Sequence, residues 1–265
     1  MIPIAAFEAD LTYHAFGSRT LRLQTPNLSG TDVKVFQTLF NAFLAHSSPL
    51  EGPVGSPILV DGIFGSVTDR AVHQWQDYFG LSGDGIVGAN VYFTLGQGIG
   101  DHTTYGGPVF GSRDLAQGST DGDVIIAQNR LNCFRYWSYI GGAADGAYGN
   151  RTSSAVSQFQ GDSGLAQTGS IGPETFDAVW STTLMGGRAL FEGRSGIDTL
   201  FLQRFLKQHA PPLYMGALDG YFGPKTRAAV VAFQASVGLS HDGVVGSSTM
   251  AQVGKQFNQP ASYWP

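Results

Sequence analysis

The side chains with the greatest chemical reactivity are few and scattered along this 265-residue chain. His73 and Asp77 stand four residues apart, but two ligands do not hold a catalytic zinc, and no His-Glu-x-x-His segment occurs. The single cysteine, Cys133, lies in an apolar segment, which is typical of a packed thiol. We therefore expect a protein that is not an enzyme, with no catalytic residue, no metal site and no cofactor.

Three arginines recur at one position of a repeated pattern, each two residues before a leucine: Arg19, Arg113 and Arg188. A guanidinium binds a carboxylate through two parallel hydrogen bonds, so these arginines are candidates for binding the carboxylates of a peptide ligand. The alternative is that each arginine pairs with an aspartate of its own repeat. The aspartates of the Gly-rich turns stand singly, which favours turn capping over a calcium loop.

Aromatic rings outside the repeated pattern are the second group of binding candidates. Tyr136, Trp137 and Tyr139 fall where we expect a connection between helices, near the surface of the protein. Such rings can stack on the faces of sugars or anchor a protein interface. The alternative is that one or two of them pack in the core.

The positions of these candidates follow from an internal repeat. The strings DGIFG (61–65), DGAYG (145–149) and DGYFG (219–223) are each followed, in one register, by Thr, Ala-Val, aromatic-Gln and Gly-Leu. A second Gly-rich turn starts 23 residues after the first Asp in every copy. The repeats predict five segments, which are an N-terminal arm (1–16), repeat 1 (17–105), repeat 2 (106–184), repeat 3 (185–256) and a C-terminal arm (257–265).

Each repeat has the apolar spacing of a compact three-helix unit with Gly-rich turns, so the fold class is mainly α. The periodicity predicts helices that begin near 32, 67, 123, 151, 198 and 225, with a short third helix after each closing turn. Gly80, Gly164 and Gly238 are expected to end the second helices in the left-handed conformation. If the repeats are equivalent, the glutamines before the turns, Gln37, Gln128 and Gln203, have the same environment.

Repeat 3 contains LFLQRFL, DGYFGPKTRAAVVAFQ and VGLSHDGVVGSSTM, an order that closely resembles the peptidoglycan-binding-like domain family of three-helix modules. The resemblance implies three tandem modules whose partner is peptidoglycan or another cell-surface glycan. It also implies a location at the cell surface or outside the cell, although the N-terminus has no signal-peptide pattern. Family modules usually accompany wall hydrolases, and little chain remains here for one, so we expect a non-enzymatic cell-wall-binding protein.

Composition excludes two further classes of function. The net charge is −5 and the few basic residues are scattered, which argues against a nucleic-acid partner. No apolar run approaches the roughly 18–20 residues of a membrane-spanning helix, so no membrane span is expected.

The alternative function is a self-assembling structural subunit of a filament, coat or similar homo-oligomer. Charged residues make up only 13% of the chain, and residues 7–15 alternate between apolar and polar as a β-strand does. Such a strand pairs either with another subunit or with its own repeat. The apolar residues of the two arms are the candidates for packing on another subunit: Phe7, Leu11, Tyr13, Phe257, Tyr263 and Trp264.

Overall fold

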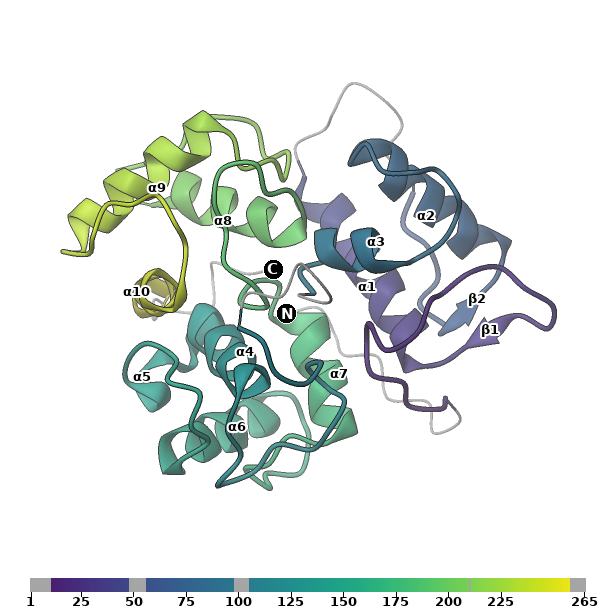
Figure 1. Cartoon of the computed structure of the whole chain (residues 1–265), viewed down its shortest axis with the longest axis horizontal. Helices are drawn as coiled ribbons and strands as arrows, with labels where there is room; N and C mark the ends of the chain where they lie inside the picture. Colours follow the sequence, from purple (N-terminus) through teal and green to yellow (C-terminus); the bar gives the residue numbers. More distant parts are fainter. Residues whose placement is uncertain (1–10, 48–55, 98–104, 210, 258–265) are drawn as a thin grey trace.

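A computed structural model of the chain describes residues 11–47, 56–97, 105–209 and 211–257, and its helices follow the three repeats (Figure 1). Repeat 1 contains β1 (Leu28–Ser29), α1 (Thr31–His46), β2 (Ile63–Phe64), α2 (Ser66–Tyr78) and α3 (Ala89–Thr94). Repeat 2 contains α4 (Gly122–Leu131), η2 (Asn132–Tyr136), α5 (Trp137–Ile140), α6 (Asn150–Asp162) and α7 (Pro173–Thr182). Repeat 3 contains α8 (Ile197–Gln208), α9 (Pro224–Ser236) and α10 (Ser247–Phe257).

The mainly α fold predicted from the repeats is confirmed, and all six predicted helix starts lie within one residue of the observed ones. The small sheet is antiparallel and pairs β1 with β2. The predicted left-handed glycines also occur, with φ of 63° at Gly80, 74° at Gly164 and 72° at Gly238. A residue with a Cβ is strained in this conformation, which explains why each second helix is followed by Gly.

The predicted N-terminal strand is absent from the part of the arm that the structure describes. Residues 11–15 form no strand. Instead, the backbone nitrogen of Thr31 donates to the carbonyl of Thr12, and the Tyr13 hydroxyl donates to the carbonyl of Gly111. Hydrogen bonds with the chain's own repeats therefore replace strand pairing at residues 11–15. Phe7 lies outside the described residues.

The predicted C-terminal arm begins one residue too early, because α10 includes Phe257. Residues 258–265, with Tyr263 and Trp264, lie outside the described residues.

The first helix of repeat 2 is longer than the sequence predicts. A π-helical turn, η2, continues α4 directly into α5, and this run holds Tyr136, Trp137 and Tyr139. The prediction that these rings lie in a connection between helices is therefore wrong. The connection starts only at Gly141, whose φ of 75° ends α5.

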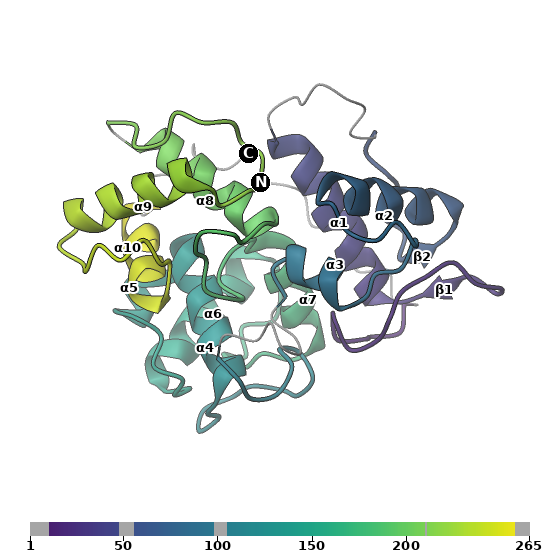
Figure 2. The ribbon, with the colours of Figure 1, turned by 45° about the horizontal axis from the view of Figure 1, so that its top comes forward.

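The three repeats form a closed ring in which every repeat contacts both others (Figures 1 and 2). Helix α7 of repeat 2 packs on α1 of repeat 1, and α10 of repeat 3 packs on α4 and η2 of repeat 2. The end of α3 in repeat 1 meets the start of α8 in repeat 3, where a Cβ on Gly196 would lie 2.3 Å from the Thr94 carbonyl oxygen. Each third helix thus packs on the first helix of another repeat.

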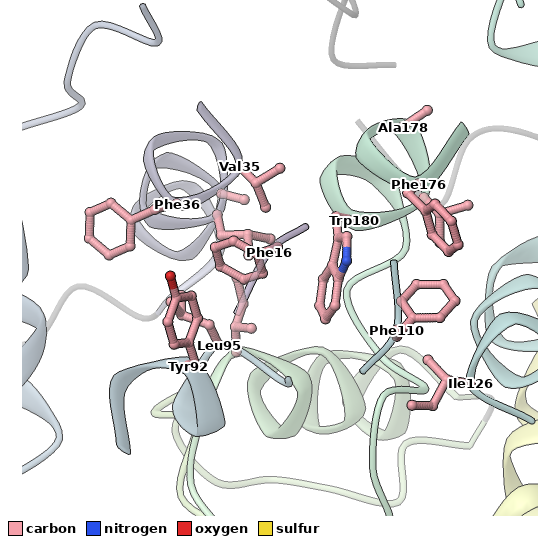
Figure 3. Packing of buried hydrophobic residues seen from close by; sticks show 14 of the residues in the cluster. Phe16, Val35, Phe36, Tyr92, Leu95, Phe110, Ile126, Phe176, Ala178 and Trp180 are labelled. Atoms are coloured by element: carbon pink, nitrogen blue, oxygen red, sulfur yellow. The ribbon is translucent and has the colours of Figure 1, made fainter. Parts of the chain in front are cut away.

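Buried rings join repeats 1 and 2 into one core. Figure 3 shows Phe16 between Tyr92 and Trp180, with ring centroids 5.0 and 5.1 Å away. Phe110 packs on the other side of Trp180, with centroids 5.7 Å apart. All four rings are buried. The packing of these rings fixes repeat 1 relative to repeat 2.

Arg130 of α4 lies at the centre of the ring. Its guanidinium lies over the Trp180 ring, 3.7 Å from the centroid, and donates to the carbonyls of Gly96 and Thr183. A Cβ on Gly187 would come within 2.8 Å of its Nη2 atom. Burial lowers the pKa of Arg130 to about 9. One side chain of repeat 2 therefore contacts parts of all three repeats.

Candidate functional site

A buried glutamine holds the first Asp-Gly turn of each repeat. In repeat 1 the Gln37 amide donates to Asp61 Oδ1 at 2.8 Å and to Thr68 Oγ1 at 3.1 Å. Its carbonyl oxygen accepts the backbone N–H groups of Asp61 and Gly62, at 3.1 and 2.8 Å. A single side chain thus satisfies the polar groups that the turn would otherwise bury without partners.

Gln128 and Gln203 make the corresponding contacts in repeats 2 and 3. The predicted equivalence of the three glutamines is confirmed. A second glutamine in each repeat holds the closing turn in the same manner: Gln76, Gln160 and Gln234. Both turns of a module are therefore held by the hydrogen bonds of one buried glutamine each.

The side chains of the turn aspartates accept hydrogen bonds from the backbone of their own turns. Asp84 accepts hydrogen bonds from the Ile86 backbone and the Gln76 amide, and these bonds hold its pKa below the usual range. The pKa of Asp145 is lowered by the corresponding bonds from Ala147 and Gln128. Turn capping, the role favoured from the sequence, is the one observed. Across the described ranges no group of three His, Cys, Asp or Glu side chains is placed to hold a metal ion.

Replacing Gln203 with Leu tests how much the glutamine that holds the first turn contributes to stability. The variant leaves the partly buried N–H of Asp219 and the buried N–H of Gly220 without their acceptor, so we expect the free energy of unfolding to fall by about 2–3 kcal/mol. Gln117→Leu is the matched control, because Gln117 is exposed and its side chain bonds to Asn150 alone among the residues that the structure describes. Its expected effect is under about 0.5 kcal/mol. Urea unfolding of both variants measures the difference, and equal losses would contradict the role of Gln203.

The three repeated arginines pair with aspartates of their own repeats. Arg19 contacts Asp32 at 2.7 Å, Arg113 contacts Asp123 at 2.8 Å, and Arg188 contacts Asp198 at 2.6 Å. Each pair is bidentate. The alternative considered from the sequence is therefore the observed arrangement, and the aspartates occupy the bidentate face that a ligand carboxylate would need.

The repeated arginines differ in their exposure to solvent. The side chain of Arg113 is 41% exposed, that of Arg19 is 26% exposed and that of Arg188 is fully buried. Phe93 of α3 covers Arg188, whose Cζ lies 4.0 Å from the ring centroid. Arg188 therefore cannot reach a ligand in this conformation, and its function is to stabilise the contact between repeats 1 and 3.

The aromatic candidates have three different environments. Tyr136 is buried and its hydroxyl donates to Asp162. Trp137 is partly buried beneath Lys255 of α10, whose Nζ lies 5.4 Å from the ring centroid. Tyr139 is 40% exposed and donates to Gln158. Of the three rings, Tyr139 offers the most surface to a ligand.

The reactive side chains considered from the sequence are not assembled into a catalytic site. Cys133 is buried, and desolvation raises the pKa of its thiol far above the usual range. His73 lies 3.7 Å from Asp69 rather than pairing with Asp77. Among the described residues, no helix is both long and apolar enough to cross a bilayer.

Sequence reasoning missed one buried carboxyl group, Asp177 of α7, which faces α1. Neither of its oxygens has a hydrogen bond of normal geometry within the described residues. Burial raises the pKa of Asp177 to about 7, and the charge of Asp32 adds to the effect, while Thr31 and Lys34 oppose it. Asp177 is five residues after the closing glycine of its repeat, where repeat 1 has Phe93, and no pattern in the sequence marks it as buried.

The repeats also match a known family. The sequence model of the family described as "Putative peptidoglycan binding domain" matches residues 29–95, 120–179 and 195–253, one match within each repeat and together well over half of the chain. The chain belongs to this family. The resemblance inferred from the Asp-Gly turns is thus confirmed, with three tandem copies.

Several curated relatives share this similarity. The chain is 32% identical over 133 residues to the N-acetylmuramoyl-L-alanine amidase CwlM of Mycobacterium tuberculosis, covering 47% of this chain and 30% of the amidase. It is 30% identical over 164 residues to the amidase CwlL of Bacillus licheniformis, covering 52% of this chain and 44% of that one. This chain therefore spans less than half the length of either amidase.

A solved structure of a peptidoglycan-binding protein from Clostridioides difficile, in complex with glutamine hydroxamate, is also similar over a short stretch. It is 36% identical and covers 26% of this chain and 42% of its own, with a TM-score of 0.23. Membership of the family is shown by the matches in the three repeats.

Proposed function

We propose that this protein binds peptidoglycan without cleaving it, and that its three modules engage the cell wall together. The single observation that supports this proposal best is the family match in all three repeats. Linked weak sites gain affinity for a repetitive polymer when their geometry lets them bind simultaneously. The proposed site of action is the cell wall, at the surface or outside the cell.

The surface of α5 and α6 around Tyr139 is the proposed sugar contact. An exposed tyrosine ring offers an apolar face to a sugar, and its hydroxyl is already held by Gln158 at 3.1 Å. Trp137 lies on the same helix next to Lys255, which adds a cation beside the ring. Arg19 and Arg113, although paired with aspartates, keep part of their guanidinium surface exposed next to the Gly-rich turns.

Co-sedimentation with purified, insoluble peptidoglycan tests the proposal. We expect the full chain to pellet with the polymer and to release no soluble muropeptides. Tyr139→Ala should weaken binding by about two- to tenfold, the effect of losing one ring contact of 0.5–1.5 kcal/mol. Met215→Ala is the control, because Met215 is the most exposed of the large apolar side chains in the described ranges.

Two results would contradict the proposal. A chain that stays in the supernatant while correctly folded does not bind the wall through these modules. Release of soluble fragments would show that the chain is an enzyme.

The alternative function as a self-assembling subunit stays a prediction. Leu11 approaches Gly62, where an added Cβ would lie 2.5 Å from Leu11 Cδ1, and Tyr13 bonds to Gly111 of the same chain. Leu11 and Tyr13 therefore contact repeats 1 and 2 of the same chain. Phe7, Tyr263 and Trp264 fall outside the described residues.

A further inference from the structure

One arginine at the junction of repeats 1 and 3 differs from the repeated arginines. Arg194 lies in the turn before α8 and is partly exposed. Its Cζ lies over two aromatic rings, 4.6 Å from the centroid of Phe93 in α3 and 4.3 Å from that of Phe191 in its own turn. Cation–π contacts with two rings restrict the rotamers of the side chain, so the guanidinium is held in place before any ligand arrives.

The side chain of Arg194 makes no hydrogen bond within the part of the chain that the structure describes. Its Nε is buried without a hydrogen-bond partner, and across the described ranges no carboxylate forms an ion pair with its guanidinium. Two acidic residues close to Arg194 in the sequence have other partners, since Asp198 binds Arg188 and Glu192 lies 3.9 Å from Arg227. The junction therefore carries one positive charge that these pairs do not balance, in a protein with a net charge of −5.

This environment suits a planar anion. The two rings cover part of the guanidinium with apolar surface, and Nε is buried, so the Nη1 and Nη2 groups are the donors left for a ligand. A carboxylate matches the fork of donors with two parallel hydrogen bonds, and phenylalanine rings exclude water from these bonds. An uncharged sugar hydroxyl gains only one weaker bond at the same place.

We propose that Arg194, with Phe93 and Phe191, binds a carboxylate of a peptide attached to the cell-wall polymer. The proposal rests on the proposed function, because it names the part of the wall that this junction recognises. In each repeated arginine the Nε–Nη2 edge of the guanidinium is already bonded to an aspartate, so that edge is not open to a ligand carboxylate.

The site occurs at only one of the three equivalent positions of the repeats. Arg194 directly precedes Ser195, which forms a β-bridge with Tyr221. The equivalent bridging residues of repeats 1 and 2 are Ser29 and Thr120, and they are preceded by Leu28 and Ser119. Phe93 is likewise replaced by Asp177 and Ala251 at the same distance from the closing turns of the other repeats. The proposed stoichiometry is therefore one carboxylate per chain, although the chain has three modules.

Titration of the full chain with two small probes tests the site. One probe is an N-acetylated dipeptide with a free C-terminal carboxylate, and the other is the same dipeptide as its C-terminal amide. We expect saturable binding of the acid at one site, followed by NMR or calorimetry, and binding of the amide weaker by about tenfold or more. Arg194→Gln should weaken binding of the acid by about the same factor, and Arg194→Lys should recover only part of it.

Arg22→Gln is the matched control, because Arg22 is an exposed arginine whose loss changes the net charge equally. We expect this control to leave binding of the acid unchanged. Equal binding of acid and amide, or an equal effect of the Arg194 and Arg22 substitutions, would overturn the proposal. Circular dichroism and Tm establish that each variant is folded.

The wall-binding experiment separates this proposal from the proposed function. If the chain co-sediments with peptidoglycan but the acid probe does not bind, the carboxylate site is wrong and wall binding stands. If the acid probe binds through Arg194 but the chain does not co-sediment, the proposed function and the wall peptide as ligand are wrong, and Arg194 stands only as a site for a free carboxylate.

Discussion

Asp198→Asn is expected to lower the free energy of unfolding by about 3–5 kcal/mol, the cost of leaving one partner of a buried ion pair uncompensated. Asp198 and Arg188 are both buried, and the two side chains are joined by bonds of 2.6 and 2.8 Å. The uncharged amide keeps the volume of the carboxylate but leaves the Arg188 cation without its counter-charge. Thermal unfolding should show a Tm lowered on the order of 10 °C for a chain of this size.

Asp123→Asn is the matched control for this prediction. Its partner Arg113 is 41% exposed and regains water when the carboxylate is removed, so we expect a loss of only about 1–2 kcal/mol. The two substitutions make the same chemical change at equivalent positions of the repeat. Losses of equal size would show that burial of the arginine is not what gives the Asp198 pair its importance.

Asp177→Asn is expected to stabilise the protein at pH 8. The folded state raises the pKa of Asp177 from 3.8 to about 7. Below about pH 3 this carboxyl is protonated in both the folded and unfolded states, so it adds no pH dependence to stability. As the pH rises from about 4 to about 7 the unfolded state loses this proton first, so the free energy of unfolding falls, in total by about 4 kcal/mol.

The Asn variant removes this titration, so its advantage over the native chain should grow between pH 4 and 7 and then stay constant at about 2–4 kcal/mol. Glu174→Gln is the control, since Glu174 is an exposed carboxylate on the same helix. Urea unfolding across this pH range measures both differences. An advantage of Asp177→Asn that is the same at pH 4 and pH 8 would contradict the assignment.

The fold of each module could be predicted from the sequence because the same local sequence patterns occur in all three repeats. The Asp-Gly turns, the glutamines that hold them and the left-handed glycines are specified by contacts within a repeat, and three copies make each pattern visible. Gln37 and Gln203, for example, make the same hydrogen bonds although repeat 1 carries an insertion before its turn. The pairing of Arg188 with an aspartate could likewise be considered from the sequence, because both residues lie in one repeat.

The contacts between repeats could not be predicted, because they depend on positions where the copies differ. Phe93 and Asp177 occupy the same place in their repeats, yet one covers a buried arginine and the other is a buried carboxyl group facing α1. The π-helical turn that carries Tyr136 into a helix is likewise a property of repeat 2 alone. No periodicity marks such residues, and the role of Arg194 became visible only when α3 and the turn before α8 were placed together.

The closed ring has a consequence for how the chain responds to stress. In a linear array of repeats the terminal repeat has one neighbour and frays first. Here each repeat has two neighbours, so loss of one repeat requires that two interfaces open at the same time. Partial unfolding is thus suppressed. Under the proposed function, the fixed spacing of the modules, rather than a flexible linker, decides which lengths of polymer can contact more than one module.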